Sequence, residues 1–469
     1  MGKYYLAVDI GASSGRHILG HLENGKIELE EIYRFENGMD HKDGKLLWNV
    51  DRLFGEILNG MKKCKEQGKI PVSMAIDTWA VDYVLLDEKD RILGDTYGYR
   101  DHRTDGMDAE VAKILPETEL YAKTGIQKQI FNTIYQLMAE KQKEPELLQR
   151  AETLLMLPDY FGFRLTGNKL SEYTNGSTTQ LVNPTTSQWD TDLIRKLGYP
   201  EDIFLPLQMP GTTVGQLLPK MQKEVGFDLE VVLCGSHDTA SAVMAVPQTS
   251  GDGIYISSGT WSLMGIESLK PIINGNAAAA NFTNEGGYDH RFRFLKNIMG
   301  LWMIQSVRHE YNDAYSFAQL CDMAEESKDF PSRVDVNDPS FLSPDNMVEA
   351  IKKYCQKTGQ QVPESVGELA SVVYRSLAQS YGETVSGLEK IAGRTYDSIH
   401  IIGGGSNAAY LNQLTADATG KTVYAGPGEA TAIGNLLAQM IHTEELADLK
   451  NARKCVRESF EIKTFVPEM

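Results

Sequence analysis

The segment Gly235–Ala240 contains the residue best suited to accept a proton during catalysis. Its sequence, GSHDTA, follows an expected strand over Leu229–Leu233 and precedes a helix of small residues. At such a junction a carboxylate lies beside a helix N-terminus, which stabilises its charge, and faces the space beyond the strand ends. We expect Asp238 to be a general base and His237 to contact the substrate. The alternative is that Asp238 only caps the helix, a frequent role of aspartate.

A second polar cluster lies at Asp77–Tyr83, with the sequence DTWAVDY. Sugars need hydrogen-bonding partners for their hydroxyl groups and apolar contact for their C–H faces, and this segment places carboxylates beside a flat indole. We therefore expect Trp79 to contact a sugar. The alternative is a buried tryptophan whose neighbouring aspartates are satisfied by hydrogen bonds within the protein.

Two segments share one pattern, in which a Ser/Gly turn joins two apolar runs. They are YYLAVDIGASSGRHILGHLE, which begins at Tyr4, and GIYISSGTWSLMGIE, which begins at Gly253. Small residues let the backbone approach a ligand, and turn amides and hydroxyls donate hydrogen bonds to phosphate oxygens. The repeat predicts two hairpins that bind one polyphosphate. The alternative is two ordinary hairpins, because Ser/Gly turns between strands are common.

The two turns differ in their charged residues. Only the first has a carboxylate before it, Asp9, and a basic side chain after it, Arg16. Carboxylate oxygens and substrate phosphates are the usual ligands of Mg²⁺. We therefore expect the first turn to bind Mg²⁺ and phosphate, and the second to bind phosphate alone.

Strands and helices alternate along the chain, which indicates an α/β protein. Apolar patterns predict strands at Tyr4–Val8, His17–His21, Ser73–Asp77, Val81–Leu86, Leu229–Leu233, Ser398–Ile402 and Thr422–Ala425. Helical periodicity predicts helices at Val50–Cys64, Pro145–Met156, Pro158–Leu165, Ser365–Ile391 and Ala409–Thr419, and a small-residue helix from Ala430.

The segment Val246–Gly253, with the sequence VPQTSGDG, is the best linker candidate. A boundary there gives two lobes, at residues 1–245 and 246–469. In the second lobe the glycine run Gly403–Asn407 follows an expected strand and opens a βαβ-like unit, which is typical of nucleotide binding, although a plain helix-entry turn is the alternative. Asn297 precedes an apolar helical pattern, so its alternative role is a helix cap.

Composition argues against several classes of partner. The 469 residues carry a net charge of -18, and the lysines and arginines form no dense basic stripe, so we expect no nucleic acid partner. The chain has no signal-like start and no run of eighteen apolar residues, which predicts a cytoplasmic protein without membrane contact. The five cysteines lack metal-ligand spacing and are interpreted as reduced structural thiols.

Taken together, the motifs resemble those of the FGGY carbohydrate kinases. In chain order they are DIGASSGR, DTWAVDYVLLD, YRDHR, LPDYFGFRLTG, GSHDTASAV, SSGTWSLMG, IIGGGSN and AGPGEATAIGN, and they cover most of the chain. The resemblance implies an α/β fold of two actin-like, ribonuclease H-type lobes with a central cleft. Within the family the motifs, together with KNIMGLW, are most similar to those of the kinases that act on L-rhamnulose.

The resemblance also implies roles for single residues. Asp238 is the implied proton acceptor, and Asp9 positions Mg²⁺ through water. The implied nucleotide-binding residues are Ser13, Ser14, Gly15, Arg16, Thr260, Gln305, Gly403 and Gly404. The implied sugar-binding residues are Ala80, His237, Thr239 and Asn297, beside Trp79. Two positions depart from the family pattern, because Ala80 stands where glycine is expected and Ala12 stands where many members have threonine.

The implied reaction transfers the γ-phosphate of ATP to the C1 hydroxyl of L-rhamnulose, a step of L-rhamnose catabolism. The implied partners are therefore ATP and a small ketose. One alternative is a kinase for another ketose or polyol, such as fuculose or xylulose. Another is a non-catalytic actin-like ATPase or sugar sensor, against which no helix-turn-helix or Cys/His zinc pattern precedes Asp9.

Overall fold

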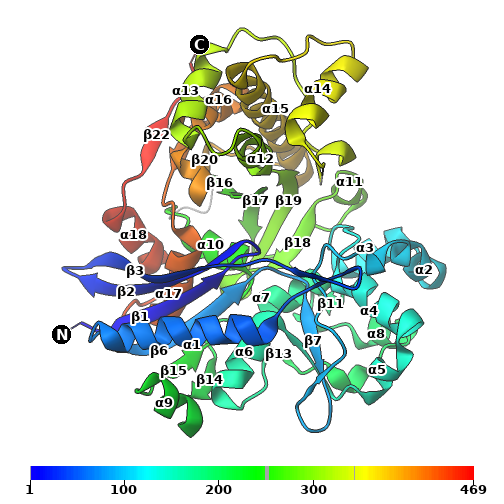
Figure 1. Ribbon diagram of the computed structural model, residues 1–469, viewed down its shortest axis with the longest axis vertical. Helices are drawn as coiled ribbons and strands as arrows, with labels where there is room; N and C mark the ends of the chain where they lie inside the picture. The colour runs from blue at the N-terminus through cyan, green and yellow to red at the C-terminus, as the bar shows by residue number, and fades with distance from the viewer. Residues whose placement is uncertain (1, 249–252, 343, 469) are drawn as a thin grey trace. The chain divides into compact units, whose positions relative to one another are not determined.

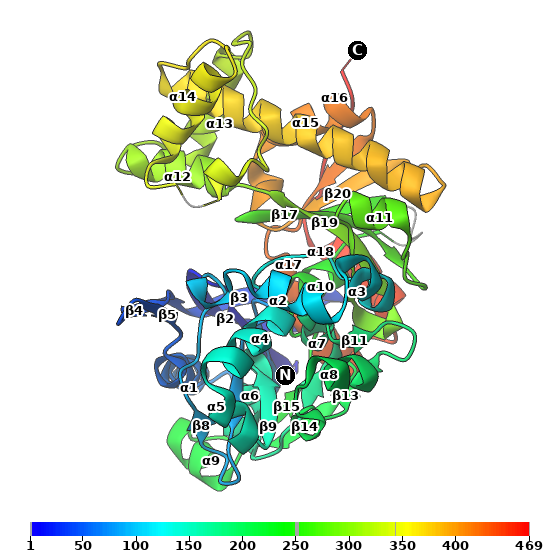
Figure 2. The ribbon, with the colours of Figure 1, turned by 90° about the vertical axis from the view of Figure 1, so that its right-hand side faces the viewer.

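The computed structural model describes residues 2–248, 253–342 and 344–468. The chain divides into two compact units (Figures 1 and 2). Unit 1 consists of Met1–Ala245, Glu267–Phe294 and Thr431–Ser459, and unit 2 of Val246–Ile266, Leu295–Ala430 and Phe460–Met469. The compact units therefore differ from the contiguous lobes 1–245 and 246–469, because two later segments pack with unit 1. Part of the expected linker Val246–Gly253, residues 249–252, lies outside the described residues.

A mixed sheet forms the centre of unit 1, and its described strands number six. Their order is β14 (Thr213–Gln216), β15 (Glu230–Val232), β6 (Pro71–Thr78), β1 (Tyr4–Ile10), β2 (Ser14–Glu23) and β3 (Lys26–Glu36). β15, β6 and β1 are parallel, whereas β2 and β3 continue the sheet antiparallel. Alternate β1 residues Leu6, Val8 and Ile10 join the apolar cluster of helix α1 (Val50–Glu66), which lies along the sheet in Figure 1.

Helix α17 (Ala430–His442) explains why the segment from Thr431 returns to unit 1. Its Gln439 donates from Nε2 to the Leu6 backbone oxygen at 3.0 Å and accepts a hydrogen bond from Ser73 at 2.7 Å. Leu436 lies so close to β2 that a Cβ at Gly20 would come within 2.5 Å of it. These contacts bind α17 to three strands of the unit 1 sheet.

A smaller sheet in unit 1 corrects one predicted helix. Its strand order is β8 (Ile92–Leu93), β7 (Tyr83–Leu86) and β9 (Thr153–Met156). The predicted helix Pro145–Met156 is therefore wrong in its second half, because α5 ends at Arg150 and the following residues pair with β7. The apolar run 153–156 is short enough to be either element, and the tertiary pairing selects the strand.

A second sheet, which contains the strands of unit 2, repeats the strand order of the first. Its order is β18 (Thr283–Gly286), β19 (Phe292–Met299), β17 (Trp261–Ser268), β16 (Gly253–Ser258), β20 (Ser398–Ile402), β21 (Thr422–Ala425) and β22 (Lys463–Phe465). Strand β18 and the start of β19, as far as Phe294, belong to the unit 1 segment Glu267–Phe294. The hairpin β16–β17 is antiparallel, and β20 and β21 follow parallel to β16, as β6 and β15 follow β1. The repeated Ser/Gly hairpin therefore belongs to a repeated sheet topology.

Long helices complete unit 2. Helix α15 (Val366–Ala392) begins with a capping box between Ser365 and Glu368 and ends at Gly393, whose φ of 69° suits the left-handed cap. It packs with α13 (Phe317–Glu326) and α16 (Ala409–Thr419).

The remaining described helices in both units are short to medium in length. They are α2 (Met107–Ile114), α3 (Glu117–Thr124), α4 (Thr133–Lys143), α6 (Leu157–Thr166), α7 (Tyr173–Gly176), α8 (Thr191–Leu197), α9 (Pro219–Val225), α10 (Asp238–Met244), α11 (Gly275–Ala279), α12 (Trp302–Glu310), α14 (Met347–Lys357) and α18 (Leu449–Ser459). The short strand pairs are β4 (Asp40–Lys42) with β5 (Lys45–Leu47), β10 (Ser171–Glu172) with β13 (Leu207–Gln208), and β11 (Val182–Asn183) with β12 (Gln188–Trp189).

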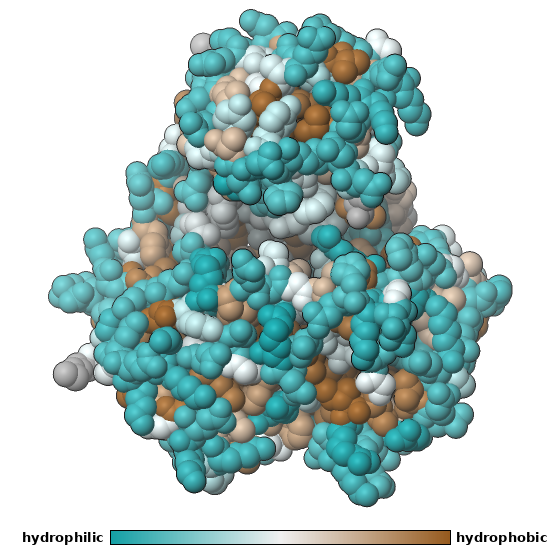
Figure 3. Space-filling view, viewed as in Figure 1, coloured by the Kyte–Doolittle hydropathy of each residue, from teal (hydrophilic) through white to brown (hydrophobic). Residues whose placement is uncertain are grey.

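The face of the molecule in Figure 3 is mostly hydrophilic, with apolar residues scattered between the charged ones. Among the described residues, no helix is both long and apolar enough to cross a membrane. All five cysteines are buried free thiols, as the sequence predicts.

Candidate active site

Asp238 is the first residue of α10, and His237 occupies the cap position before it. The capping alternative is therefore wrong, because the cap falls one residue earlier. The Asp238 side chain is about one-third exposed, at 33%, and its Oδ1 accepts a hydrogen bond from Thr239 Oγ1 at 3.0 Å. Burial, followed by the charge of Asp9, raises the pKa of Asp238, although His237 opposes the shift. A raised pKa brings a carboxylate closer to the range useful for accepting a proton.

The turn that carries Asp238 is held by a buried carboxylate that the sequence did not reveal. Glu172 accepts hydrogen bonds from the backbone nitrogen and the hydroxyl of Ser236, at 3.2 and 2.6 Å. It also accepts from Thr174 and from the backbone nitrogen of Asn175. Burial raises the pKa of Glu172, while these donors oppose the shift. The Ser236–Asp238 turn is thus tied to a segment more than sixty residues away in the chain.

The first hairpin brings Asp9 and Arg16 together as a pair. Arg16 contacts Asp9 Oδ2 through Nε at 3.0 Å and through Nη2 at 2.9 Å. The turn is closed by a hydrogen bond from the Gly11 backbone nitrogen to the Ser14 carbonyl, at 2.9 Å. Ser13 at its tip is exposed. The turn therefore presents the exposed Ser13 next to a charged pair.

Asp77 adds a further carboxylate beside Asp9, since the two residues stand opposite each other on the parallel strands β6 and β1. Asp77 is fully buried, and Asn435 of α17 donates to its Oδ2 at 2.6 Å. Burial, followed by the charge of Asp9, raises the pKa of Asp77 well above the usual aspartate range.

The residues fit a magnesium ion held mainly by water and phosphate. Among the described residues, no group of three His, Cys, Asp or Glu side chains is arranged as a metal cage. Mg²⁺ usually keeps several waters and takes one or two protein carboxylates together with substrate phosphates. Asp9, with an 11% exposed side chain at the edge of the hairpin, is a carboxylate of this kind.

Several side chains of the cluster at Asp77–Tyr83 are buried and form hydrogen bonds within the protein, although the sequence predicts a sugar contact for this segment. Asp82 Oδ2 accepts hydrogen bonds from the indole nitrogens of Trp79 and Trp48, at 2.9 and 2.6 Å. The two indole rings lie 4.0 Å apart between centroids. Trp79 is only 7% exposed, so the alternative of a buried tryptophan with a satisfied aspartate describes it well. Ala80, which directly follows Trp79, is partly exposed.

Ala80 and His237 lie on neighbouring backbone segments. Thr78 forms a parallel bridge with His237, and its backbone nitrogen donates to the Ser236 carbonyl at 2.9 Å. The structure therefore brings together, within unit 1, three of the residues expected to bind sugar and the expected base: Ala80, His237, Thr239 and Asp238. Asn297 belongs to unit 2 and lies inside strand β19, so it is not a helix cap.

The second hairpin lies at the start of a helix in unit 2. The backbone nitrogen of Trp302, the first residue of α12, donates to the Thr260 carbonyl at 3.1 Å, and Gln305 lies in the first turn of the same helix. Gly403 has a φ of 81°, and a Cβ at this position would come within 3.0 Å of the Ser258 carbonyl. The turn, Gln305 and the Gly403–Gly404 segment are therefore neighbours. This is the arrangement expected of a nucleotide site.

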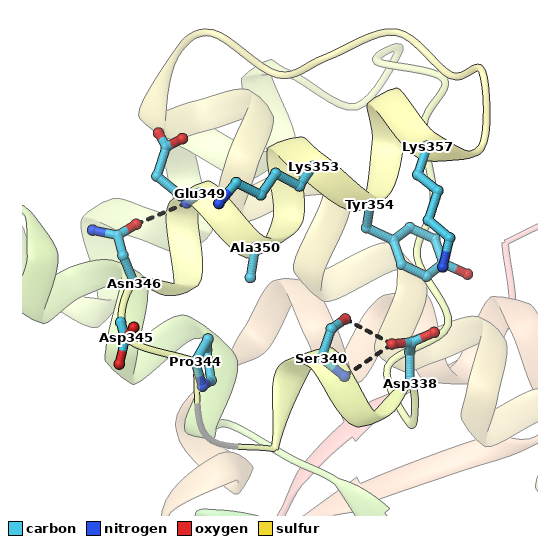
Figure 4. Close-up of a pocket in the computed structure, with 10 residues that line it drawn as sticks. All are labelled: Asp338, Ser340, Pro344, Asp345, Asn346, Glu349, Ala350, Lys353, Tyr354 and Lys357. Atoms are coloured by element: carbon cyan, nitrogen blue, oxygen red, sulfur yellow. Dashed lines mark hydrogen bonds between the residues drawn. The ribbon is translucent and has the colours of Figure 1, made fainter.

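A separate cavity of about 410 Å³ lies in unit 2, where it is lined by residues of α14 and by Asp338, Ser340, Pro344, Asp345 and Asn346 (Figure 4). Its visible hydrogen bonds are local caps, from Ser340 to Asp338 and from the Glu349 backbone nitrogen to Asn346. None of the residues expected to bind nucleotide or sugar lines it. We assign it no role in the reaction.

Several residues around the site were not predicted: Glu172, Glu285, Arg293 and Asn435. Only Asn435 gave a usable signal, because it and Gln439 are amides four residues apart on an otherwise apolar helix. Such a pair shares one helix face and needs buried partners. The other three stand in segments whose sequences show no distinctive pattern.

Solved structures share this fold. A crystal structure of xylulose kinase from Lactobacillus acidophilus aligns with a TM-score of 0.81 and 16% identity, covering 99% of this chain and 94% of that one. Plasmodium falciparum glycerol kinase with ADP aligns with a TM-score of 0.78 and 14% identity, covering 100% and 94%. At this identity the likeness shows the fold, which is the two-domain actin-like fold of sugar kinases.

Sequence relatives and family descriptions cover nearly the whole chain. A rhamnulokinase of Halalkalibacterium halodurans is 54% identical over 464 residues, covering 99% of both chains. A rhamnulokinase of Bacillus subtilis is 46% identical over 467 residues, covering 99% of this chain and 95% of that protein. The N-terminal domain of the FGGY family of carbohydrate kinases matches residues 4–245, and its C-terminal domain matches residues 254–443. The motif-based prediction is confirmed, and the chain belongs to the FGGY family of carbohydrate kinases.

Proposed function

We propose that this protein transfers the γ-phosphate of ATP to the C1 hydroxyl of L-rhamnulose, giving L-rhamnulose 1-phosphate and ADP. The support for this substrate is the set of full-length relatives named rhamnulokinase, at up to 54% identity. The observation in the structure that carries the chemistry is Asp238. It is a partly exposed carboxylate with a raised pKa at the first position of α10, beside His237.

In the proposed reaction Asp238 accepts the proton of the C1 hydroxyl. The hydroxyl oxygen then forms a bond to the γ-phosphorus, the bond between that phosphorus and the β–γ bridging oxygen breaks, and ADP leaves. Ala80, His237 and Thr239 orient the ketose, and a sugar contact of Asn297 stays a prediction from the family resemblance. A positioned base of this kind contributes about 10²- to 10⁴-fold in rate.

The nucleotide is proposed to bind through backbone amides and hydroxyls. In unit 1 these come from the Ser13–Arg16 turn, and in unit 2 from Thr260, Gln305 and the Gly403–Gly404 turn. Asp9 is proposed to hold Mg²⁺ through water. When bound, Mg²⁺ neutralises charge on the phosphate oxygens.

The proposal is tested by measuring ADP release with L-rhamnulose, L-fuculose, D-xylulose and no sugar. We expect strict dependence on sugar and the highest kcat/KM with L-rhamnulose, with activity lost when Mg²⁺ is chelated and restored when it is added back. A higher kcat/KM for another ketose would assign the enzyme to that sugar. Sugar-independent hydrolysis would instead favour the switch ATPase alternative.

The role of Asp238 is tested with Asp238→Asn, which keeps the shape of the side chain but removes the base. Turnover should fall by about 10²- to 10⁴-fold, with sugar binding retained. A matched control is Asp190→Asn, because Asp190 is a buried aspartate that caps helix α8 in the same unit. The control should keep wild-type turnover, and near-normal turnover of Asp238→Asn would overturn the assignment.

A further inference from the structure

Arg293, in strand β19, is a fully buried arginine in contact with His237. Its Nη2 lies 3.0 Å from His237 Nδ1 and 3.1 Å from Glu285 Oε2, while its Nε donates to the Gly286 carbonyl at 2.8 Å. On the other side of the imidazole, His237 Nε2 lies 3.5 Å from Asp238 Oδ1. The four side chains thus form a chain from a buried ion pair to the proposed base.

The contact with Arg293 favours one position for the imidazole proton. An arginine is always protonated and can only donate, so a hydrogen bond from Nη2 across the 3.0 Å to His237 needs a lone pair on Nδ1. A neutral imidazole carries its single proton on the other nitrogen, Nε2, which faces Asp238. Glu285 Oε2, 3.3 Å from Nδ1, would favour the opposite tautomer, but this distance is longer than the 3.0 Å between Nδ1 and Arg293 Nη2, and the same Nη2 forms an ion pair with Oε2. Burial raises the pKa of Glu285, yet Arg293 and His237 lower it overall, so Glu285 remains ionised.

We propose that Arg293 is a positioning residue that holds His237 as the neutral Nε2–H tautomer. His237 is then a hydrogen-bond donor toward Asp238 and a sugar oxygen, which leaves the Asp238 carboxylate as the proton acceptor on the Nε2 side of the imidazole. This inference rests on the proposed sugar kinase reaction. The Nε2–H tautomer matters there because it places one hydrogen-bond donor, His237, and one base, Asp238, beside the reacting hydroxyl.

Packing alone does not account for the Arg293–Glu285 pair. Replacing a buried ion pair by apolar side chains of similar volume is often neutral or stabilising, so such a pair is weak support for stability. Arg293 Nη1 has no hydrogen-bond partner among the described residues, which is a cost rather than a gain. The contact of Arg293 with His237 instead indicates that the Arg293–Glu285 pair has a functional role.

The tautomer is measured directly by long-range proton–nitrogen NMR of protein labelled with ¹⁵N-histidine, with His237→Gln used to assign the signal. At neutral pH and without substrates we expect a protonated Nε2 and an unprotonated Nδ1 at His237. A proton on Nδ1 would overturn the proposal. Because this readout needs no turnover, it stands or falls separately from the identity of the sugar.

Kinetics of Arg293→Lys form the second test, since a lysine keeps the charge beside Glu285 but cannot occupy the positions of both Nε and Nη2. We expect kcat/KM for the sugar to fall by about 10- to 100-fold, KM for ATP to stay unchanged, and the Nδ1–H tautomer to appear in the NMR spectrum. The matched control is Arg103→Lys, because Arg103 forms a similar buried pair with Glu140 at 2.6 Å. The control should retain the wild-type tautomer and wild-type kcat/KM.

A double variant guards against misfolding after loss of a single charge. Arg293→Met combined with Glu285→Met removes both members of the pair and should fold. If it folds with the wild-type tautomer and wild-type kcat/KM, Arg293 has no positioning role. Loss of kcat/KM together with a mixed His237 tautomer supports the role.

Discussion

Glu172 accepts a hydrogen bond from the Ser236 hydroxyl at 2.6 Å and another from the Ser236 backbone nitrogen at 3.2 Å. Both residues are almost completely buried. Ser236 directly precedes the His237–Asp238 pair, so this contact fixes the backbone from which the proposed base extends. A carboxylate can accept several hydrogen bonds at once. The donors to Glu172 among the described residues are Ser236 of the turn, and Thr174 and Asn175 of α7, which directly follows Glu172.

We predict that Glu172→Gln weakens both stability and catalysis. A glutamine amide has an NH₂ group where the carboxylate has an acceptor, so at least one donor of the turn loses its partner. This should lower the free energy of unfolding by about 1–3 kcal/mol. Turnover should also fall while KM for ATP is unchanged, because the Ser236–Asp238 turn is less well held. Urea unfolding and steady-state kinetics check both effects, and a variant equal to wild type in both would contradict the role of Glu172.

The activity should show an acidic limb that reports on Asp238. Its pKa is raised from 3.8, mainly by burial, and the residue must be deprotonated to accept the hydroxyl proton. We expect kcat/KM for the sugar to fall about tenfold per pH unit below a midpoint that lies above 3.8. Measurement of kcat/KM from pH 4.5 to 8.5 checks this, with unfolding followed in parallel. A limb with the opposite sign, with activity rising toward low pH, would be inconsistent with Asp238 as the base.

Asp82→Asn should destabilise the protein in a pH-dependent way. Asp82 accepts from Trp48, Trp79 and Gln136, so an amide at this position should cost about 1–3 kcal/mol at pH 7. Burial raises the pKa of Asp82 to about 6 from 3.8, which means that the folded state binds the proton more tightly. Asp82 therefore favours folding at low pH, and this contribution is lost as the pH rises from about 4 to 6.

The pH dependence of Asp82 can be isolated by comparing the two proteins. The stability of wild type relative to Asp82→Asn should increase by about 1 kcal/mol between pH 7 and pH 5. Chemical unfolding of both proteins at the two pH values measures this difference. A constant difference would mean that the folded-state pKa of Asp82 is not raised.

Gly434→Ala should destabilise unit 1 strongly. A Cβ at Gly434 in α17 would lie 1.7 Å from the Ser241 backbone oxygen of α10, and backbone cannot move aside as a flexible side chain can. We expect a loss of at least about 1–3 kcal/mol in the free energy of unfolding, and lower activity because α10 begins with Asp238. The matched control is Gly387→Ala in α15, where no atom other than the adjacent backbone of the helix itself lies within 4 Å of the added Cβ. The control should be neutral or more stable by up to about 1 kcal/mol, because alanine favours helix over glycine. Thermal or urea unfolding of both variants measures the contrast.

The sequence by itself determined the family, the α/β class and the strand–turn–strand repeat. These features are local: apolar runs, Ser/Gly turns and capping signals lie within a few residues of one another, so they can be recognised without knowing the fold. Helix α15 and the hairpins β1–β2 and β16–β17 were predicted in this way. The helix expected over Pro145–Met156 failed because its second half is a short apolar run whose state depends on pairing with β7.

Only the tertiary structure decided how the proposed base is supported and which polar side chains are structural. Ser236 is bound by Glu172, 64 residues away, and His237 by Arg293, 56 residues away. It also showed that Trp79 and Asp82 satisfy each other in a buried cluster. The physical reason is that burial and hydrogen-bond partners arise where distant segments meet in the fold, and these contacts decide whether a polar residue catalyses, positions or packs.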